Sequence, residues 1–224
     1  QIENEYYSPI RPKQIAERGE TPTEALERRG IAYVEFRAID LDPYSDIGIR
    51  LSSACFLEVM ALYCLLNDSP DLLPNEEEEL AINIDRVVNE GRREGLCIIN
   101  NGTEQAFESW MLGHLSNMLP LAALLDAHHG GNDYRAALAL MQGKTVNSES
   151  TISAQVNADS ARLGSMWQLG TTLAKQHRNA LSQMTLSPNI QAKYEVLAEK
   201  SILQQAEMEA SETEDFMDFI QQYR

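Results

Sequence analysis

The period of the apolar residues changes once along this chain, near residue 44, and this change restricts the folds open to it. Residues 31–37, IAYVEFR, alternate apolar and polar side chains, which is the period of a β-strand. From about residue 49, apolar side chains recur every three or four residues, as on one face of a helix. We therefore predict an α+β, predominantly α-helical fold, with a short β segment over residues 1–44 and a helical domain over residues 45–224.

Helix signals are frequent in the second part of the chain. The acidic run from Glu76 to Glu79 follows Asn75, a residue that caps helices, and acids are favoured in a first helical turn. The run therefore indicates a helix start and not a metal site. Helices are predicted over residues 49–67, from 75 onward, 103–129, 132–141, 158–184 and from 188 onward. We also predict a capping box at 211–214, a break at 95–102, a polar linker at 141–150 and a connection at 14–30.

The net charge of the chain is -16, from 18 basic and 34 acidic residues. Binding to a phosphate backbone needs clustered lysine and arginine, so the charge argues against a nucleic-acid partner. Residues 1–37 are an exception, with six basic and seven acidic residues. This segment is the least repulsive place for an anionic ligand.

Neither a membrane span nor an export signal is indicated. The apolar runs fall short of the roughly 20 residues that a membrane helix needs, and no charged-then-apolar segment opens the chain. Cys55, Cys64 and Cys97 lack zinc-finger spacing, which favours buried, reduced thiols. We expect a cytoplasmic protein, and the absence of an initiator methionine suggests a piece of a longer one.

The strand at residues 31–37 places Glu35 and Arg37 on one face and apolar side chains on the other. Their Cα atoms are expected about 6.5 to 7 Å apart, close enough to serve one ligand. An exposed strand with a weak surface ion pair has the same pattern. The pattern alone leaves both interpretations open.

The first 37 residues contain the residue types that phosphoryl transfer uses. A carboxylate such as Glu35 can bind Mg²⁺, and Arg37 can hold phosphoryl oxygens. Tyr7 can orient a carboxylate by a hydrogen bond, and Arg11 and Lys13 can hold an anion. The common glycine-rich phosphate loops and the serine-hydrolase motif are absent from this sequence.

Two segments, QIENEYYSPIRPK and GIAYVEFRAIDLDPYSDIGI, carry a family likeness. Together with INIDRVVNEGRREGL and QQAEMEASETEDF, they resemble the carboxyl-terminal part of bacterial glutamate-cysteine ligase. The resemblance implies that the β segment belongs to a catalytic sheet like that of glutamine synthetase. It also implies a ligase, with Mg²⁺, that joins L-glutamate to L-cysteine with ATP through a γ-glutamyl phosphate, the first step of glutathione biosynthesis.

The same resemblance implies roles for individual residues. Glu35 matches a Mg²⁺ ligand, and Arg37 matches the catalytic arginine that holds the transferring phosphoryl group. Tyr7 matches a substrate-binding tyrosine, while Arg11 and Lys13 match a loop that we assign to ATP or phosphate. The remaining residues of the site are expected in the missing amino-terminal portion of the enzyme, so the chain alone is expected to be inactive.

Two other functions are compatible with the residues. One is a non-catalytic helical interaction or regulatory module, because the helical part shows no chemistry of its own. The other is a glutamine-synthetase-like enzyme with a different acceptor amine.

Overall fold

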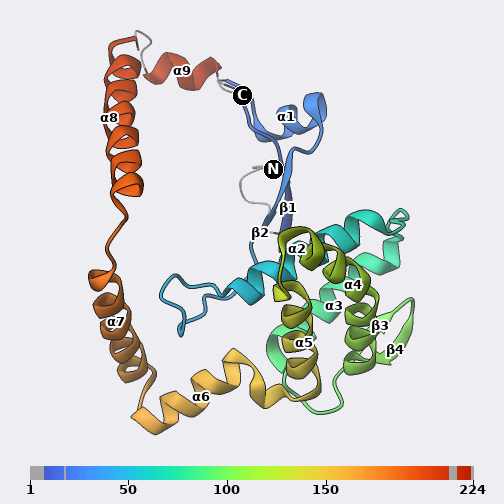
Figure 1. Cartoon of the computed structure of the whole chain (residues 1–224). Coiled ribbons are helices and arrows are strands. Elements are labelled where there is room, and N and C mark those ends of the chain that lie inside the picture. The colour runs from blue at the N-terminus through green and yellow to red at the C-terminus, as the bar shows by residue number, and fades with distance from the viewer. Residues whose placement is uncertain (1–7, 18, 212–215, 223–224) are drawn as a thin grey trace. The chain divides into compact units, whose positions relative to one another are not determined.

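The computed structural model describes residues 8–17, 19–211 and 216–222 (Figure 1). It has two compact units, residues 41–182 and residues 1–40 with 183–224. The first elements are β1 Ile10–Lys13, α1 Pro22–Arg29, β2 Tyr33–Phe36, α2 Leu51–Leu66, α3 Pro74–Glu90, β3 Cys97–Asn100 and β4 Thr103–Ala106. They are followed by α4 Phe107–His129, α5 Asp133–Val146, α6 Ile152–Leu163, α7 Met166–Gln183, α8 Pro188–Ser211 and α9 Phe216–Gln222. The mostly helical α+β prediction is confirmed, while the predicted division at residue 44 stays a prediction.

Strands β1 and β2 form an antiparallel ribbon. Ile10 lies opposite Phe36 and Pro12 lies opposite Val34. Residues in opposite positions share a face of the ribbon, so these side chains make up its apolar face. Ile10 and Val34 are each 47% exposed.

Helix α1 lies in the segment that the sequence pattern assigned to a plain connection, so that assignment was wrong. Thr21 accepts a hydrogen bond from the Glu24 amide at 3.3 Å, and the Glu24 carboxylate accepts one from the Thr21 amide at 2.8 Å. This capping box satisfies amide groups at the start of the helix. Pro22 adds a residue suited to the first turn, and Ala25 is fully buried.

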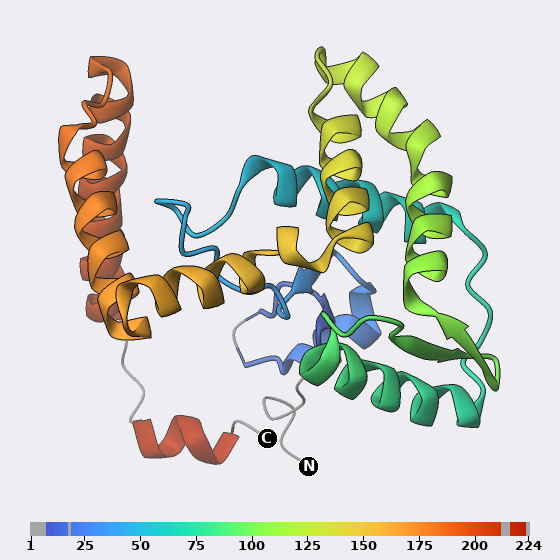
Figure 2. The same ribbon diagram turned by 90° about the horizontal axis from the view of Figure 1, so that it is seen from below.

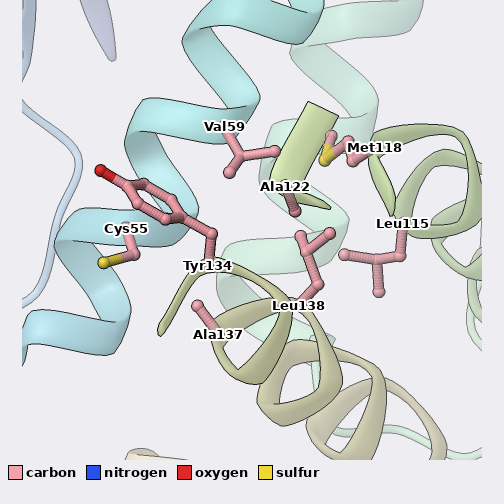
Figure 3. Packing of buried hydrophobic residues seen from close by; sticks show 8 residues of the cluster. All are labelled: Cys55, Val59, Leu115, Met118, Ala122, Tyr134, Ala137 and Leu138. Atoms are coloured by element: carbon pink, nitrogen blue, oxygen red, sulfur yellow. The ribbon is translucent and has the colours of Figure 1, made fainter. Parts of the chain in front are cut away.

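The core of residues 41–182 lies between α2, α4 and α5. The side chains from these three helices point toward one another in Figure 3. The buried cluster consists of Cys55, Val59, Leu115, Met118, Ala122, Tyr134, Ala137 and Leu138. The predicted helix at 49–67 is confirmed by α2, which brings Cys55 and Val59, four residues apart, onto the buried face.

Asp126 near the end of α4 fixes the start of α5. Its carboxylate accepts hydrogen bonds from the Tyr134 amide at 2.9 Å and from the Arg135 Nε at 2.7 Å. Burial would raise the pKa of Asp126, but the bonds from Arg135 and the amides outweigh it and lower the pKa. The charged carboxylate thus joins two helices of the core.

A β-hairpin occupies the segment that the sequence pattern assigned to a break. Strands β3 and β4 pair antiparallel, and Figure 2 shows them beside α3 and leading into α4. The turn has Asn101 at φ 51° and Gly102 at φ 73°, a left-handed conformation that Asn-Gly favours in two-residue hairpins. The predicted helix from residue 103 therefore begins only at Phe107.

Several predicted helix boundaries also change. The helix expected at 158–184 consists of α6 and α7, separated at Gly164, whose φ is 89°. Helix α5 continues to Val146, into the predicted polar linker. Helix α3 begins at Pro74 with Leu73 before it, and the prediction of Asn75 as the cap was wrong. The predicted start at 188 is confirmed by α8, while the predicted capping box at 211–214 lies largely outside the described residues.

None of the helices in the described part of the chain has the length and apolar character of a membrane span. All three cysteines are free thiols. Cys55 is buried, but Cys64 is exposed and Cys97 is half-buried, so the prediction of buried thiols holds for Cys55 alone.

Candidate active site

The pairing of β1 with β2 brings four of the predicted site residues onto one face of the ribbon. Arg11 lies opposite Glu35, and Lys13 lies opposite Tyr33. The Arg37 amide continues this register by donating to the Pro9 carbonyl at 2.8 Å. Arg11, Lys13, Glu35 and Arg37 therefore share a face. Tyr7, the fifth predicted residue, lies outside the described residues.

Each oxygen of the Glu35 carboxylate faces a different cation. Lys13 Nζ lies 3.4 Å from Oε2, and Arg37 Nε lies 3.9 Å from Oε1. The three side chains are between 28% and 40% exposed. Ion pairs with this exposure contribute about 0 to 1 kcal/mol to stability, so they explain little of the fold.

Glu35 Oε2 is enclosed but accepts no hydrogen bond from any described residue. A buried carboxylate oxygen without a hydrogen bond is unfavourable unless a cation satisfies it. Mg²⁺ binds one or two protein carboxylates together with substrate phosphates, and Glu35 fits one such position. The described residues contain no group of three metal-binding side chains, so Glu35 can supply only part of a metal site.

An open hollow of about 340 Å³ lies beside Arg37. Ser8, Pro9, Arg37 and Ala38 line it. The sequence pattern identified Arg37 but missed the other three residues. Their proximity follows from the pairing of β1 with β2, which a single sequence does not specify.

Ion pairs in the segment between the strands hold the end of the ribbon in place. The Glu20 side chain is 6% exposed and accepts a hydrogen bond from Arg28 at 2.9 Å and from Arg29 at 2.5 Å. Arg29 also donates to the Ile15 carbonyl at 2.8 Å. The hydrogen bond from Arg29, aided by a backbone bond from Glu17, lowers the pKa of Glu20 to about 2. The charged network thus ties α1 to the chain that leaves β1.

A second polar cluster fixes the turn at the start of residues 41–182. Asp42 is buried, pairs with Arg50 and accepts a hydrogen bond from the Tyr44 amide at 2.9 Å. The Tyr44 hydroxyl donates to Asp159 at 2.9 Å. Burial, followed by this bond, raises the pKa of Tyr44 to about 12. These contacts anchor the turn to α6 and suggest no chemistry.

Comparison with known sequences links this chain to one family of enzymes. A model of the glutamate-cysteine ligase family matches residues 1–87. The whole chain is 42% identical to glutamate-cysteine ligase of Pseudomonas fluorescens strain Pf0-1 and 39% identical to that of Azotobacter vinelandii. The chain spans only 42% of the length of either relative.

Two solved structures are similar to this chain. Glutamate-cysteine ligase of Francisella tularensis, in complex with AMP, has a TM-score of 0.86 and 28% identity, with 99% of this chain and 44% of that chain covered. A bifunctional glutathione synthetase of Pasteurella multocida has a TM-score of 0.55 and 23% identity, covering 80% of this chain and 22% of that one. The second likeness concerns the fold alone.

Proposed function

Since the chain belongs to the glutamate-cysteine ligase family, we propose that it forms part of an enzyme that joins L-glutamate to L-cysteine. In this reaction ATP phosphorylates the γ-carboxylate of glutamate. The amine of cysteine then attacks the acyl phosphate, and γ-glutamylcysteine, ADP and phosphate are released. The AMP bound to the Francisella relative supports an adenine nucleotide as a ligand of the enzyme.

The observation that carries this proposal is the polar face of the ribbon. Three cations, Arg11, Lys13 and Arg37, share that face with one carboxylate, on a chain whose net charge is -16. Such an excess of positive charge suits a phosphate group. The enclosed oxygen of Glu35 suits a cation that accompanies the phosphate.

Each residue of the face has a proposed task. Arg37 stabilises the charge that develops on the phosphoryl oxygens during transfer, which is the main demand of this chemistry. Arg11 and Lys13 hold phosphate oxygens of ATP. Glu35 would hold Mg²⁺, which neutralises phosphate charge when bound. For Tyr7, which lies outside the described residues, we propose contact with the amino-acid substrate.

One carboxylate does not complete a metal site. We infer that the other ligands and most of the substrate pocket lie in the part of the family's length that this chain does not span. The chain alone should therefore release no phosphate in the presence of ATP, glutamate and cysteine. We also propose that the enzyme is cytoplasmic.

Substitution of Glu35→Gln in the full-length enzyme tests the proposal. The amide removes the negative charge that binds a hard cation while keeping the size of the side chain. We expect the Mg²⁺ concentration for half-maximal, cysteine-dependent phosphate release to rise roughly tenfold or more.

The matched control is Glu27→Gln, an exposed carboxylate on α1. It should leave the Mg²⁺ requirement unchanged, because it is exposed on α1 and does not belong to the two strands that carry the polar face. An unchanged requirement in Glu35→Gln would reject the metal role, and phosphate release without either amino acid would reject the ligase reaction.

A further inference from the structure

Lys13 satisfies the Glu35 carboxylate by charge alone. Its ammonium lies 3.4 Å from Glu35 Oε2, yet that oxygen accepts no hydrogen bond among the described residues. Glu35 Oε2 is thus enclosed next to a cation that is near but not bonded to it. Such a contact is easier to exchange than a hydrogen-bonded ion pair.

The backbone of Lys13 is held by β2, whereas its side chain is a flexible stem. Lys13 pairs with Tyr33 in the ribbon, and its carbonyl accepts a hydrogen bond from the Ala32 amide at 2.9 Å. The side chain is a four-carbon stem that is 28% exposed. The ammonium can therefore change its partner without a change in the strand.

A divalent cation and the Lys13 ammonium cannot occupy the same place at Glu35. Mg²⁺ binds carboxylate oxygens at about 2.0 to 2.1 Å, well inside the 3.4 Å that separates Lys13 from Oε2. A metal ion bound to Oε2 and the Lys13 ammonium next to the same oxygen would repel each other, because both are positive. The metal therefore requires the ammonium to leave, and bound phosphate offers it a new negative partner on the same face.

We propose that Lys13 is a positioning residue that holds Glu35 in the metal-free site and passes to a phosphoryl oxygen when the metal binds with its nucleotide. This inference rests on the proposed function, because it assumes that Glu35 is a metal ligand. Arg37 cannot play this part, since its Nε lies 3.9 Å from the other oxygen, Oε1. Within the part of the chain that the structure describes, Lys13 is the cation at the enclosed oxygen.

Substitution of Lys13→Ala in the full-length enzyme tests the exchange by two binding measurements. Mn²⁺, a paramagnetic substitute for Mg²⁺, is titrated without nucleotide and followed by electron paramagnetic resonance. ATP is titrated by calorimetry at saturating Mg²⁺. We expect Mn²⁺ to bind about fivefold more tightly, because a competing charge is lost, and ATP to bind about fivefold more weakly, because a phosphate partner is lost.

The opposite signs separate an exchange from mere damage. If Lys13 had a purely structural role, Lys13→Ala would weaken the binding of both Mn²⁺ and ATP. That result, or no change in Mn²⁺ binding, would overturn the proposal. Lys13→Arg, which keeps the competing positive charge at Glu35, should not strengthen Mn²⁺ binding. Lys175→Ala removes the same charge from an exposed position on α7 and should change neither affinity.

Glu35→Gln, measured in the same way, separates the proposed metal role of Glu35 from the proposed exchange of Lys13. If it leaves Mn²⁺ binding unchanged, the proposed metal role of Glu35 fails. If it weakens Mn²⁺ binding while Lys13→Ala does not strengthen it, only the role of Lys13 fails.

Discussion

The β1–β2 ribbon and the α2, α4 and α5 core use their side chains in opposite ways. In the ribbon no strand residue is buried, as far as the structure describes it, and one face carries Arg11, Lys13 and Glu35. In the helical core eight side chains are buried together, and charged groups serve to join helices, as Asp126 does. The proposed chemistry and most of the stabilising burial therefore lie in separate parts of the sequence. Substitutions should therefore affect either activity or stability, according to the region.

The largest effect is expected from Arg37→Ala in the full-length enzyme. Loss of charge stabilisation in the transition state should lower kcat about 10² to 10³-fold. The midpoint of urea unfolding should stay unchanged, because the side chain is 37% exposed. Arg93→Ala, at a more exposed ion pair, serves as the control and should keep full activity. Near-normal turnover in Arg37→Ala would reject the proposed catalytic role of Arg37 in the ribbon.

A smaller effect, on stability alone, is expected from Leu138→Ala. Leu138 is 2% exposed in the helical core, and its truncation leaves a cavity that should cost about 3 kcal/mol of unfolding free energy. Leu140→Ala on the same helix removes a side chain that is 40% exposed and should cost about 1 kcal/mol. Urea unfolding measures both values. Equal losses would contradict the placement of the core.

The smallest effect concerns the pH dependence of α1. The ordinary pKa of Glu20 is 4.5, and Arg29 lowers it to about 2 in the folded chain. A lowered folded pKa means that the ion pair stabilises α1 fully above the ordinary pKa and is lost as the pH falls toward about 2. Backbone chemical shifts of α1 should show this loss, and Glu20→Gln should abolish it. In Glu27→Gln the chemical shifts of α1 should change with pH as in the parent. If Glu20→Gln also showed the parent's pH dependence, Glu20 would be excluded as the group responsible.

The face shared by Glu35 and Arg37 could be predicted from the sequence because alternation along one strand is a local property. Their meeting with Lys13 could not, because it depends on which strand pairs with β2 and in which register. Residues 14–32, which include α1, separate the two strands in the sequence. The proposed roles of these residues come from the resemblance to a family, whereas the contact between Lys13 and Glu35 follows from the register of β1 and β2.

Helix α1 and the β3–β4 hairpin, which the sequence analysis did not predict, both have local sequence signals. Thr21 and Glu24 form a capping box, a helix-start pattern that was present in the presumed connection. Asn101 and Gly102 form a dipeptide typical of two-residue hairpins, within the segment predicted as a break. Helix ends such as Val146 are harder, because tertiary packing and not local propensity sets them.

Pro12 gives the two edges of the ribbon different capacities for growth. Because the Arg37 amide bonds to the Pro9 carbonyl, the alternation of the ladder turns the ring nitrogen of Pro12 away from β2. A further strand beside β1 would find no donor at that position, whereas β2 contains no proline. Extension of the sheet is therefore favoured on the β2 side by one main-chain hydrogen bond.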